Sequence, residues 1–355
     1  MLWERRSPSI TPEIAAMNPP CSPSPSPRDS LRALLAAVVA LSLSLVLQNA
    51  RVLADNKPDE NTPAAAKTFE VKDVRDVAYY EGPDADNVKH KLDLFLPKDG
   101  KGFPVVIFVH GGAWRHGDKN FFGVYSALGK MFARNGIGAV IINYRLSPGV
   151  MHPEHEKDVA RAFAWTHKNI EKYGGRPDQI FISGHSAGGH LVALLASDET
   201  YLKAEGLSLG DIKGVMPLSG VYALPDTAKL SAELGIKQVR LRGDAEIPMG
   251  ELLFTSVFGK DPETRKNAFP LSHIKKNLPP FLIVYADRDL PTLDKGAEEF
   301  AKELKEKDVK VDLLQIAKRN HLSLITEASA DDDATAVAMR RFIANQIKDD
   351  KRDAK

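Results

Sequence analysis

The sequence predicts an α/β fold built on a mostly parallel sheet of eight strands with helices on both faces. Short apolar runs rich in branched residues alternate along the chain with longer amphipathic stretches. Such runs are typical of strands that are buried on both faces. The chain has 355 residues, of which 43% are hydrophobic and 27% charged. A single domain can therefore bury a full core, and wholesale disorder is excluded.

Charge and cysteine content exclude several classes of function. Lys and Arg number 48 against 47 Asp and Glu, so no overall field attracts nucleic acid or an anionic membrane. Cys21 is the only cysteine, which excludes an intrachain disulfide and a thiolate zinc or iron–sulfur site. No His-Glu-x-x-His spacing is present, and we therefore expect no metal.

The amino-terminal segment predicts export. Residues 34–47 (LLAAVVALSLSLVL) carry no charge, and they match a signal-peptide core while falling short of the roughly 20 residues that span a bilayer. Small residues at 52 and 54 favour cleavage after Ala54, so we interpret 1–54 as a signal peptide, with an uncleaved membrane anchor as the alternative. A start at Met17 would give the same signal peptide a more ordinary length. Residues 55–68 are polar and contain Pro, which predicts a flexible linker.

Eight strands and five helices are expected after residue 69. The first two strands alternate polar and apolar residues around Gly82 and Pro83, which predicts an antiparallel pair. The expected strands are 71–80, 90–96, 104–109, 139–142, 179–182, 214–218, 281–285 and 309–316. Amphipathic periodicity predicts the helices 121–135, 154–173, 187–196, 294–307 and 331–347. This alternation places helices on both faces of a parallel sheet.

One segment interrupts the alternation. Residues 224–278 have weak periodicity and scattered Gly and Pro, so we expect a small helical insertion before the seventh strand. Ligands bind at the carboxyl edge of open α/β sheets, and the insertion is expected to form part of a pocket wall there. The folded domain is assigned to 69–347, and 348–355 form a charged tail.

Residues 184–188 (GHSAG) carry the strongest chemical signal. They follow an apolar strand and open a helix. In that context Gly-x-Ser-x-Gly forms a tight turn that forces Ser186 into a strained conformation and exposes its hydroxyl beside a helix amino terminus. Ser186 is therefore a candidate nucleophile. A simple helix cap with incidental glycines is the alternative interpretation.

The sequence HGGAW follows the strand PVVIFV. Consecutive glycines allow the N–H groups of Gly111 and Gly112 to turn toward an anion, and with the N–H of Ala187 they predict an oxyanion hole. We expect His110 to orient this loop by hydrogen bonding rather than to act as a base. Trp114 is either a pocket wall or part of the core.

Two acids follow the strand PFLIVYA. A catalytic triad needs a carboxylate at a strand's end, after the Ser and before the His in chain order. Asp289 is far enough past the strand to turn back toward the helix that follows Ser186, so we expect Asp289 to be the acid and Asp287 to be a surface or turn-capping acid. His321 follows the last strand and is the only His beyond Asp289, which makes it the candidate base.

The ordered combination of HGGAW, NYRLSP at 143–148, GHSAGG, the acid and the His resembles the α/β-hydrolases of the hormone-sensitive-lipase and acetyl-esterase group. The resemblance covers about residues 70–347. It implies an α/β-hydrolase fold and hydrolysis of carboxylic esters through an acyl-enzyme, without a cofactor. By position it assigns the triad already named, and it implies a structural ion pair between Arg145 and Asp158.

The sequence departs from that group at His185, where many lipase-like members have Asp. GHSAGGHL together with SGVYAL (219–224) is closer to arylformamidases and to secreted feruloyl and acetylxylan esterases. These departures leave the acyl and leaving-group preferences open. His185 and Tyr222 join Trp114 as candidate residues of the substrate pocket.

Four functions remain open at this point. The first is an exported serine hydrolase acting on small-molecule or saccharide-linked esters, with no nucleic-acid partner and no stable membrane insertion after cleavage. An arylformamidase-like amide hydrolase is the second, and a serine peptidase the third. A non-catalytic binding module would be expected to have a broken triad, whereas all three members are present. Because the apolar fragment 249–258 lies close to charged residues, the insertion offers little wall to a long acyl chain.

Overall fold

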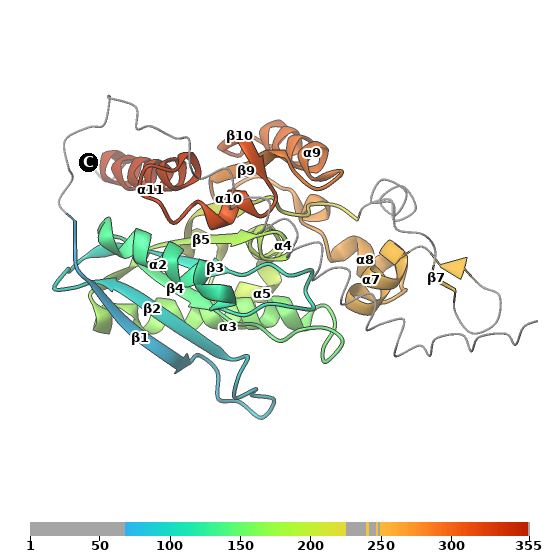
Figure 1. Cartoon of the computed structure of the whole chain (residues 1–355), viewed down its shortest axis with the longest axis horizontal. Coiled ribbons are helices and arrows are strands. Elements are labelled where there is room, and N and C mark those ends of the chain that lie inside the picture. The colour runs from blue at the N-terminus through green and yellow to red at the C-terminus, as the bar shows by residue number, and fades with distance from the viewer. Residues whose placement is uncertain (1–67, 225–238, 241–245, 248, 354–355) are drawn as a thin grey trace, which may run out of the picture. The chain divides into compact units, whose positions relative to one another are not determined.

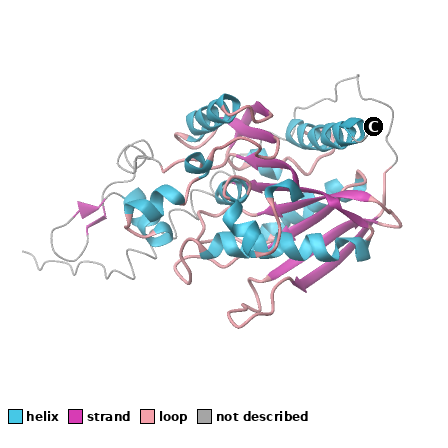
Figure 2. Cartoon of the chain, turned by 180° about the vertical axis from the view of Figure 1, so that it is seen from behind, coloured by secondary structure: helices cyan, strands magenta, loops and turns pink. Residues whose placement is uncertain are grey.

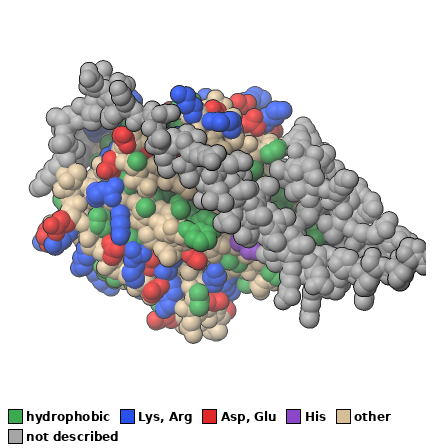
Figure 3. Space-filling view, in the orientation of Figure 1, with side chains coloured by type: hydrophobic (Ala, Val, Ile, Leu, Met, Phe, Trp, Pro, Cys, Tyr) green, Lys and Arg blue, Asp and Glu red, His purple; other side chains and the backbone are tan. Residues whose placement is uncertain are grey.

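The computed structural model describes residues 68–224, 239–240, 246–247 and 249–353. The predicted signal peptide, nearly all of the predicted linker and parts of the predicted insertion lie outside the described residues. Among the helices that are described, none combines the length and the apolar character needed to cross a bilayer. On the face shown in Figure 3, Lys and Arg side chains are interspersed with Asp and Glu.

An eight-stranded sheet forms the centre of the described domain (Figures 1 and 2). Its strands are β1 (Val71–Ala78), β2 (Lys91–Pro97), β3 (Phe103–Val109), β4 (Gly138–Ile142), β5 (Gly175–His185), β6 (Ile212–Leu218), β9 (Phe281–Arg288) and β10 (Val311–Asn320). The spatial order is β1-β2-β4-β3-β5-β6-β9-β10. β2 is antiparallel to both of its neighbours, and the other pairs are parallel. The predicted sheet is therefore confirmed, including its antiparallel first pair.

The central strands are buried on both faces, as their unbroken apolar sequences predict. In β3, Val105 and Ile107 belong to one hydrophobic core. The intervening Val106 and Phe108 belong to the other. Because successive side chains of a strand point to opposite faces, a strand with a core on each side shows no polar alternation.

Helices cover both faces of the sheet (Figure 2) and contribute side chains to the two cores. The helices around the sheet are α2 (Val124–Arg134), α3 (Glu154–Asn169), α4 (Ala187–Leu195), α5 (Glu199–Ala204), α9 (Leu293–Glu306), α10 (Ser323–Thr326) and α11 (Ala334–Asp353). Short 3₁₀ segments are η1 (Phe121–Gly123), η2 (Ile170–Tyr173) and η3 (Leu209–Asp211). Side chains of α3, α4 and α9 share a core with Val105, and those of α2 and α11 share the opposite one. The predicted charged tail largely continues α11, since this helix runs to Asp353.

The described part of the predicted insertion contains helices and one very short strand pair. Its elements are β7 (Val239–Arg240), β8 (Glu246–Ile247), α7 (Met249–Phe258), α8 (Pro262–Asn267) and η4 (Pro270–His273). In α7, Phe254, Val257 and Phe258 are buried. The ring of Phe258 lies 5.0 Å from that of Trp114, measured between ring centroids. The apolar side of α7 is therefore used in packing against the domain.

Candidate active site

Ser186 lies on the sharp turn between β5 and α4. Its φ of 56° and ψ of −118° are the strained conformation that the sequence predicts for a nucleophile on such a turn. A Cβ on Gly184 would lie 2.4 Å from the carbonyl oxygen of Gly188, and a Cβ on Gly188 would lie 2.1 Å from that of Val109. Both glycines are therefore required because neighbouring backbone passes too close for a side chain.

His321 and Asp289 form a hydrogen-bonded pair beyond the carboxyl ends of β9 and β10. Nδ1 of His321 lies 2.7 Å from Oδ1 of Asp289, and the two side chains are 13% and 2% exposed. Because a carboxylate accepts, Nδ1 carries the hydrogen and Nε2 is left with its lone pair. Burial acts to raise the pKa of Asp289, but the hydrogen bond and charge of His321 hold that pKa below its usual value. The acid is thus ionised at neutral pH.

Three further donors hold the Asp289 carboxylate. The hydroxyl of Ser219 donates to Oδ2, and the N–H of Ala286 donates to the same oxygen at 3.1 Å. The N–H of Leu290 donates to Oδ1 at 2.8 Å. In the sequence, this role of Ser219 is signalled only by its place at the start of the SGVYAL motif.

Asp287 has a different function in the structure. Its Oδ2 accepts a hydrogen bond from the N–H of Lys318 at 2.8 Å, and its Oδ1 accepts one from the N–H of Arg319 at 2.9 Å. Both oxygens are therefore engaged with the end of β10, in agreement with a turn-capping acid. The structure pairs Asp289, and not Asp287, with His321.

Gly111 passes directly beside Ser186 but does not present its N–H to a substrate. A Cβ on Gly111 would lie 3.1 Å from Cβ of Ser186. Its N–H donates to the hydroxyl of Tyr125 at 3.1 Å, so the expectation that Gly111 is an oxyanion donor is wrong. Glycine is required at this position for the close approach of two loops.

Other backbone N–H groups, in the loop after β3 and in the turn after β5, remain available to bind an oxyanion. Those of Gly112, Ala113 and Ala187 have no hydrogen-bond partner within the part of the chain that the structure describes. A Cβ on Gly112 would lie 2.1 Å from the carbonyl oxygen of His116, and φ of Gly112 is 124°. Gly112 and Ala187 therefore stay candidate oxyanion donors, and Ala113 is an additional candidate that sequence reasoning missed.

His110 is fully buried at the base of the same loop. Its Nδ1 donates to the carbonyl of Gly111 at 2.8 Å, and its ring stacks on Tyr144 with centroids 4.4 Å apart. Burial lowers the pKa of His110 to about 4, so the ring is neutral at neutral pH. These contacts agree with an orienting residue rather than a base.

Trp114 and Tyr222 belong to the core and not to a substrate pocket. Trp114 is 3% exposed, and its indole N–H donates to Nδ1 of His190 at 3.1 Å. Tyr222 is 2% exposed and stacks on Phe300 with ring centroids 4.6 Å apart. Both rings belong to one hydrophobic core, which agrees with the core alternative for Trp114 and disagrees with the pocket role expected of Tyr222.

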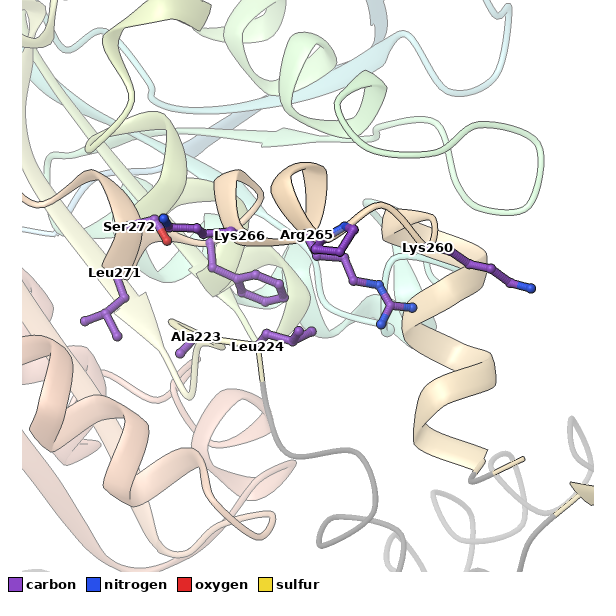
Figure 4. Close-up of a pocket in the computed structure, with 9 residues that line it drawn as sticks. Ala223, Leu224, Lys260, Arg265, Lys266, Leu271 and Ser272 are labelled. Atoms are coloured by element: carbon purple, nitrogen blue, oxygen red, sulfur yellow. The ribbon is translucent and has the colours of Figure 1, made fainter. Parts of the chain in front are cut away.

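A pocket of about 380 Å³ adjoins these elements (Figure 4). It is lined by residues of the segment after β6 and of the described insertion: Ala223, Leu224, Lys260, Pro262, Arg265, Lys266, Phe269, Leu271 and Ser272. The ring of Phe269 lies 5.3 Å from that of His190, which is on the helix that begins after Ser186. The pocket therefore lies close to α4, which follows Ser186, and to the segment after β6 that contains Ser219.

The ion pair implied by the family resemblance is present. Nε of Arg145 lies 2.9 Å from Oδ2 of Asp158, and Nη2 lies 2.7 Å from Oδ1. Nε2 of His90 lies 2.9 Å from the same carboxylate, which is fully buried. This pair fixes the segment after β4 against α3 and has no contact with the triad.

Metal binding finds no support in the described residues, where no group of three or more His, Cys, Asp or Glu side chains is arranged to hold an ion. The histidines at 152, 155 and 190 are buried or half-buried. Burial lowers the pKa of His152 and His155 to about 4 and that of His190 to about 3. They are therefore neutral packing residues.

Comparison with known proteins finds a matching family model and relatives that are named as esterases. A family model described as BD-FAE matches residues 92–304, a range that includes Ser186 and Asp289 and ends before His321. Esterase LipC of Mycobacterium tuberculosis is 32% identical over 224 residues, which are 62% of this chain and 53% of that protein. Isoprenylcysteine alpha-carbonyl methylesterase ICME of Arabidopsis thaliana is 28% identical over 247 residues, which are 68% and 56%. The chain thus spans about half the length of the curated relatives it matches.

Solved structures show the same architecture. Esterase B of Lactobacillus rhamnosis superposes with a TM-score of 0.68 at 20% identity, covering 91% of this chain and 99% of that one. A carbohydrate esterase from gut microbiota, in truncated form, superposes with a TM-score of 0.60 at 20% identity, covering 79% and 98%. At such identities the likeness shows a shared fold.

Proposed function

The chain belongs to the BD-FAE family and has the α/β-hydrolase fold, and we propose on this basis that it is a serine hydrolase of carboxylic esters. The observation that carries the proposal is the His321–Asp289 hydrogen bond of 2.7 Å, formed in the loops that also approach the strained turn of Ser186. His185, the neighbour of Ser186, contacts His321 with ring centroids 4.6 Å apart. The candidate nucleophile, acid and base follow β5, β9 and β10 of one sheet, and the contact of His185 with His321 supports their acting together.

The reaction follows from these positions. Oγ of Ser186 attacks the ester carbonyl carbon while Nε2 of His321 takes the hydroxyl proton. The tetrahedral intermediate collapses, the bond to the alcohol oxygen breaks, and His321 returns the proton to the leaving alcohol. Water then attacks the acyl-enzyme with the same base, which releases the carboxylic acid and restores Ser186.

Two other groups of residues stabilise charge during these steps. Asp289 keeps the hydrogen on Nδ1 of His321 and stabilises the imidazolium that forms. The N–H groups of Gly112, Ala113 and Ala187 have no partner among the described residues. They support an oxyanion hole, because backbone donors in a water-excluding site stabilise a developing negative charge.

We assign small acyl groups to this site, on simple or carbohydrate-linked esters. The support comes from α7, whose Phe254, Val257 and Phe258 are buried against the domain. An apolar surface that is already used in packing cannot bind a long acyl chain. Burial of one methylene group contributes about 0.8 kcal/mol to binding only where an apolar surface is available to contact it.

A fluorophosphonate probe tests the proposal directly. Wild-type protein is expected to react at Ser186 and to hydrolyse p-nitrophenyl acetate, with Ser186→Ala lowering kcat by about 10⁴- to 10⁶-fold at an unchanged circular dichroism spectrum. A variant that keeps more than about a tenth of the activity would contradict the assignment of the nucleophile. Turnover of N-formylkynurenine in place of p-nitrophenyl esters would establish the formamidase alternative.

We also propose that the protein is exported, to the periplasm or the cell exterior. The support is the uncharged run at 34–47 and the small residues at 52 and 54. Mass spectrometry of the mature protein is expected to find Asp55 as the first residue. An intact amino terminus in the membrane fraction would favour an anchor.

A further inference from the structure

We propose that His185 is a positioning residue that fixes the base His321 by binding its main-chain carbonyl. Nε2 of His185 lies 2.8 Å from the carbonyl oxygen of His321. The two rings lie 4.6 Å apart at an interplanar angle of 42°. Because a carbonyl oxygen only accepts, Nε2 of His185 carries the hydrogen and donates it. This assignment rests on the proposed function, since it defines a role toward the catalytic base.

The hydrogen bond connects two parts of the site that no strand ladder joins. His185 is the last residue of β5 and directly precedes Ser186, whereas His321 directly follows β10. In the sheet, β6 and β9 lie between these two strands. Within the described residues, no other hydrogen bond links the loop of His321 to the turn of Ser186. His185 therefore connects the loop of the base directly to the turn of the nucleophile.

The surroundings of His185 hold its ring in place. The residue is 3% exposed, with His321 against its ring. A Cβ on Gly111 would lie 3.1 Å from Nδ1 of His185. The lack of a side chain at Gly111 thus leaves room for the ring beside the oxyanion loop.

The charge state of His185 suits this role. Burial, together with the neighbouring His321, lowers the pKa of His185 to about 3. A neutral imidazole can donate the hydrogen bond without placing a second positive charge beside the imidazolium that His321 becomes during catalysis. The backbone carbonyl and the side chain of His321 are therefore held separately, by His185 and by Asp289.

The expected effect of losing this bond is on the rate and not on substrate binding. Alignment of reacting groups contributes strongly to catalysis, and a displacement of about 1 Å can cost about 10²-fold in rate. His185→Leu keeps a similar volume but has no donor, so we expect kcat to fall by about 10- to 100-fold with KM nearly unchanged. His185→Gln places a side-chain N–H at a similar distance from the backbone, and it should recover most of that loss.

The kinetic constants are measured on p-nitrophenyl acetate, with active sites counted by fluorophosphonate titration and folding checked by thermal melting. His273→Leu is the matched control, because Nε2 of His273 also binds a backbone carbonyl, that of Asn267 at 2.7 Å, and has no contact with the triad. We expect this control to keep the wild-type kcat.

Three outcomes would overturn the assignment: a wild-type kcat per active site in His185→Leu, an equal loss in His185→Gln, or a loss of kcat in the control of the same size. If His185→Leu does not fold, His185→Asn replaces it, because the shorter amide does not reach the carbonyl of His321. Equal kcat values in the Asn and Gln variants would then refute the positioning role of His185. A wild-type chain that neither reacts with the probe nor cleaves esters would refute the proposed function and this role together.

Discussion

Ser219, directly after β6, donates its hydroxyl hydrogen to Oδ2 of Asp289, which follows the adjacent strand β9. The N–H of Ser219 in turn donates to the carbonyl of Val284 in β9 at 2.8 Å. The acid is therefore fixed through Oδ2 by the residue that follows the neighbouring strand, while its Oδ1 binds His321 and the N–H of Leu290. The orientation of the base depends on this arrangement as well as on the acid itself.

Ser219→Ala should lower kcat/KM on p-nitrophenyl acetate by about 10-fold. The variant removes one charge-assisted hydrogen bond, which is worth about 1.5–3 kcal/mol, and the N–H of Ala286 still binds the same oxygen. Steady-state kinetics on protein with a wild-type melting temperature would measure the effect. Unchanged kcat/KM would show that the backbone donors alone orient the acid.

Asp289→Asn and Asp287→Asn form a matched pair for the identity of the acid. Asp289→Asn should lower kcat by about 10⁴-fold, because an amide no longer holds the hydrogen on Nδ1 of His321. Asp287→Asn should have a much smaller effect, because it disturbs only the hydrogen bonds to the end of β10. The two kcat values are compared on one substrate, and a reversed order would make Asp287 the acid.

Acyl length should limit activity. We expect kcat/KM on p-nitrophenyl esters to be highest between acetate and butyrate and to fall by octanoate, since the buried apolar residues of α7 give later methylenes no surface to contact. A series of esters from acetate to palmitate measures this. A steady rise to palmitate, or activation at an oil–water interface, would identify a true lipase.

Glu156 should make the folded state less stable as pH rises. It is fully buried on α3, and within the described part of the chain neither carboxyl oxygen has a hydrogen-bond partner. Burial, with a contribution from Asp198, raises its pKa well above the usual value. Above about pH 4.3 the Glu156 carboxyl group loses its proton in the unfolded chain but keeps it in the native state. The free energy of unfolding therefore falls by up to about 1.4 kcal/mol per pH unit until the pH reaches the pKa of Glu156 in the native state.

Glu156→Gln removes this titration and supplies the control. Urea unfolding of both proteins between pH 4.5 and 8 should show similar stability at the acid end and a growing advantage of the Gln variant toward pH 8. Parallel curves for the two proteins would mean that Glu156 is ionised in the native state and has a partner for its charge.

The sequence by itself determined the sheet, its antiparallel first pair and the turn that carries Ser186. These features depend on local patterns, because strand burial appears as unbroken apolar runs and a tight turn requires glycines at fixed positions. The position of Asp289, far enough past the strand to turn back, also favoured it over Asp287, and the structure pairs Asp289 with His321.

Only the tertiary structure decided how these residues are held. The N–H of Gly111 is engaged by Tyr125, Trp114 and Tyr222 are in the core, and His185 binds a carbonyl 136 positions away in the chain. Such contacts join segments that meet only when the sheet and its helices pack together. The residue types in a motif do not specify which neighbour will face each donor, because that depends on the distance and direction of groups from other strands.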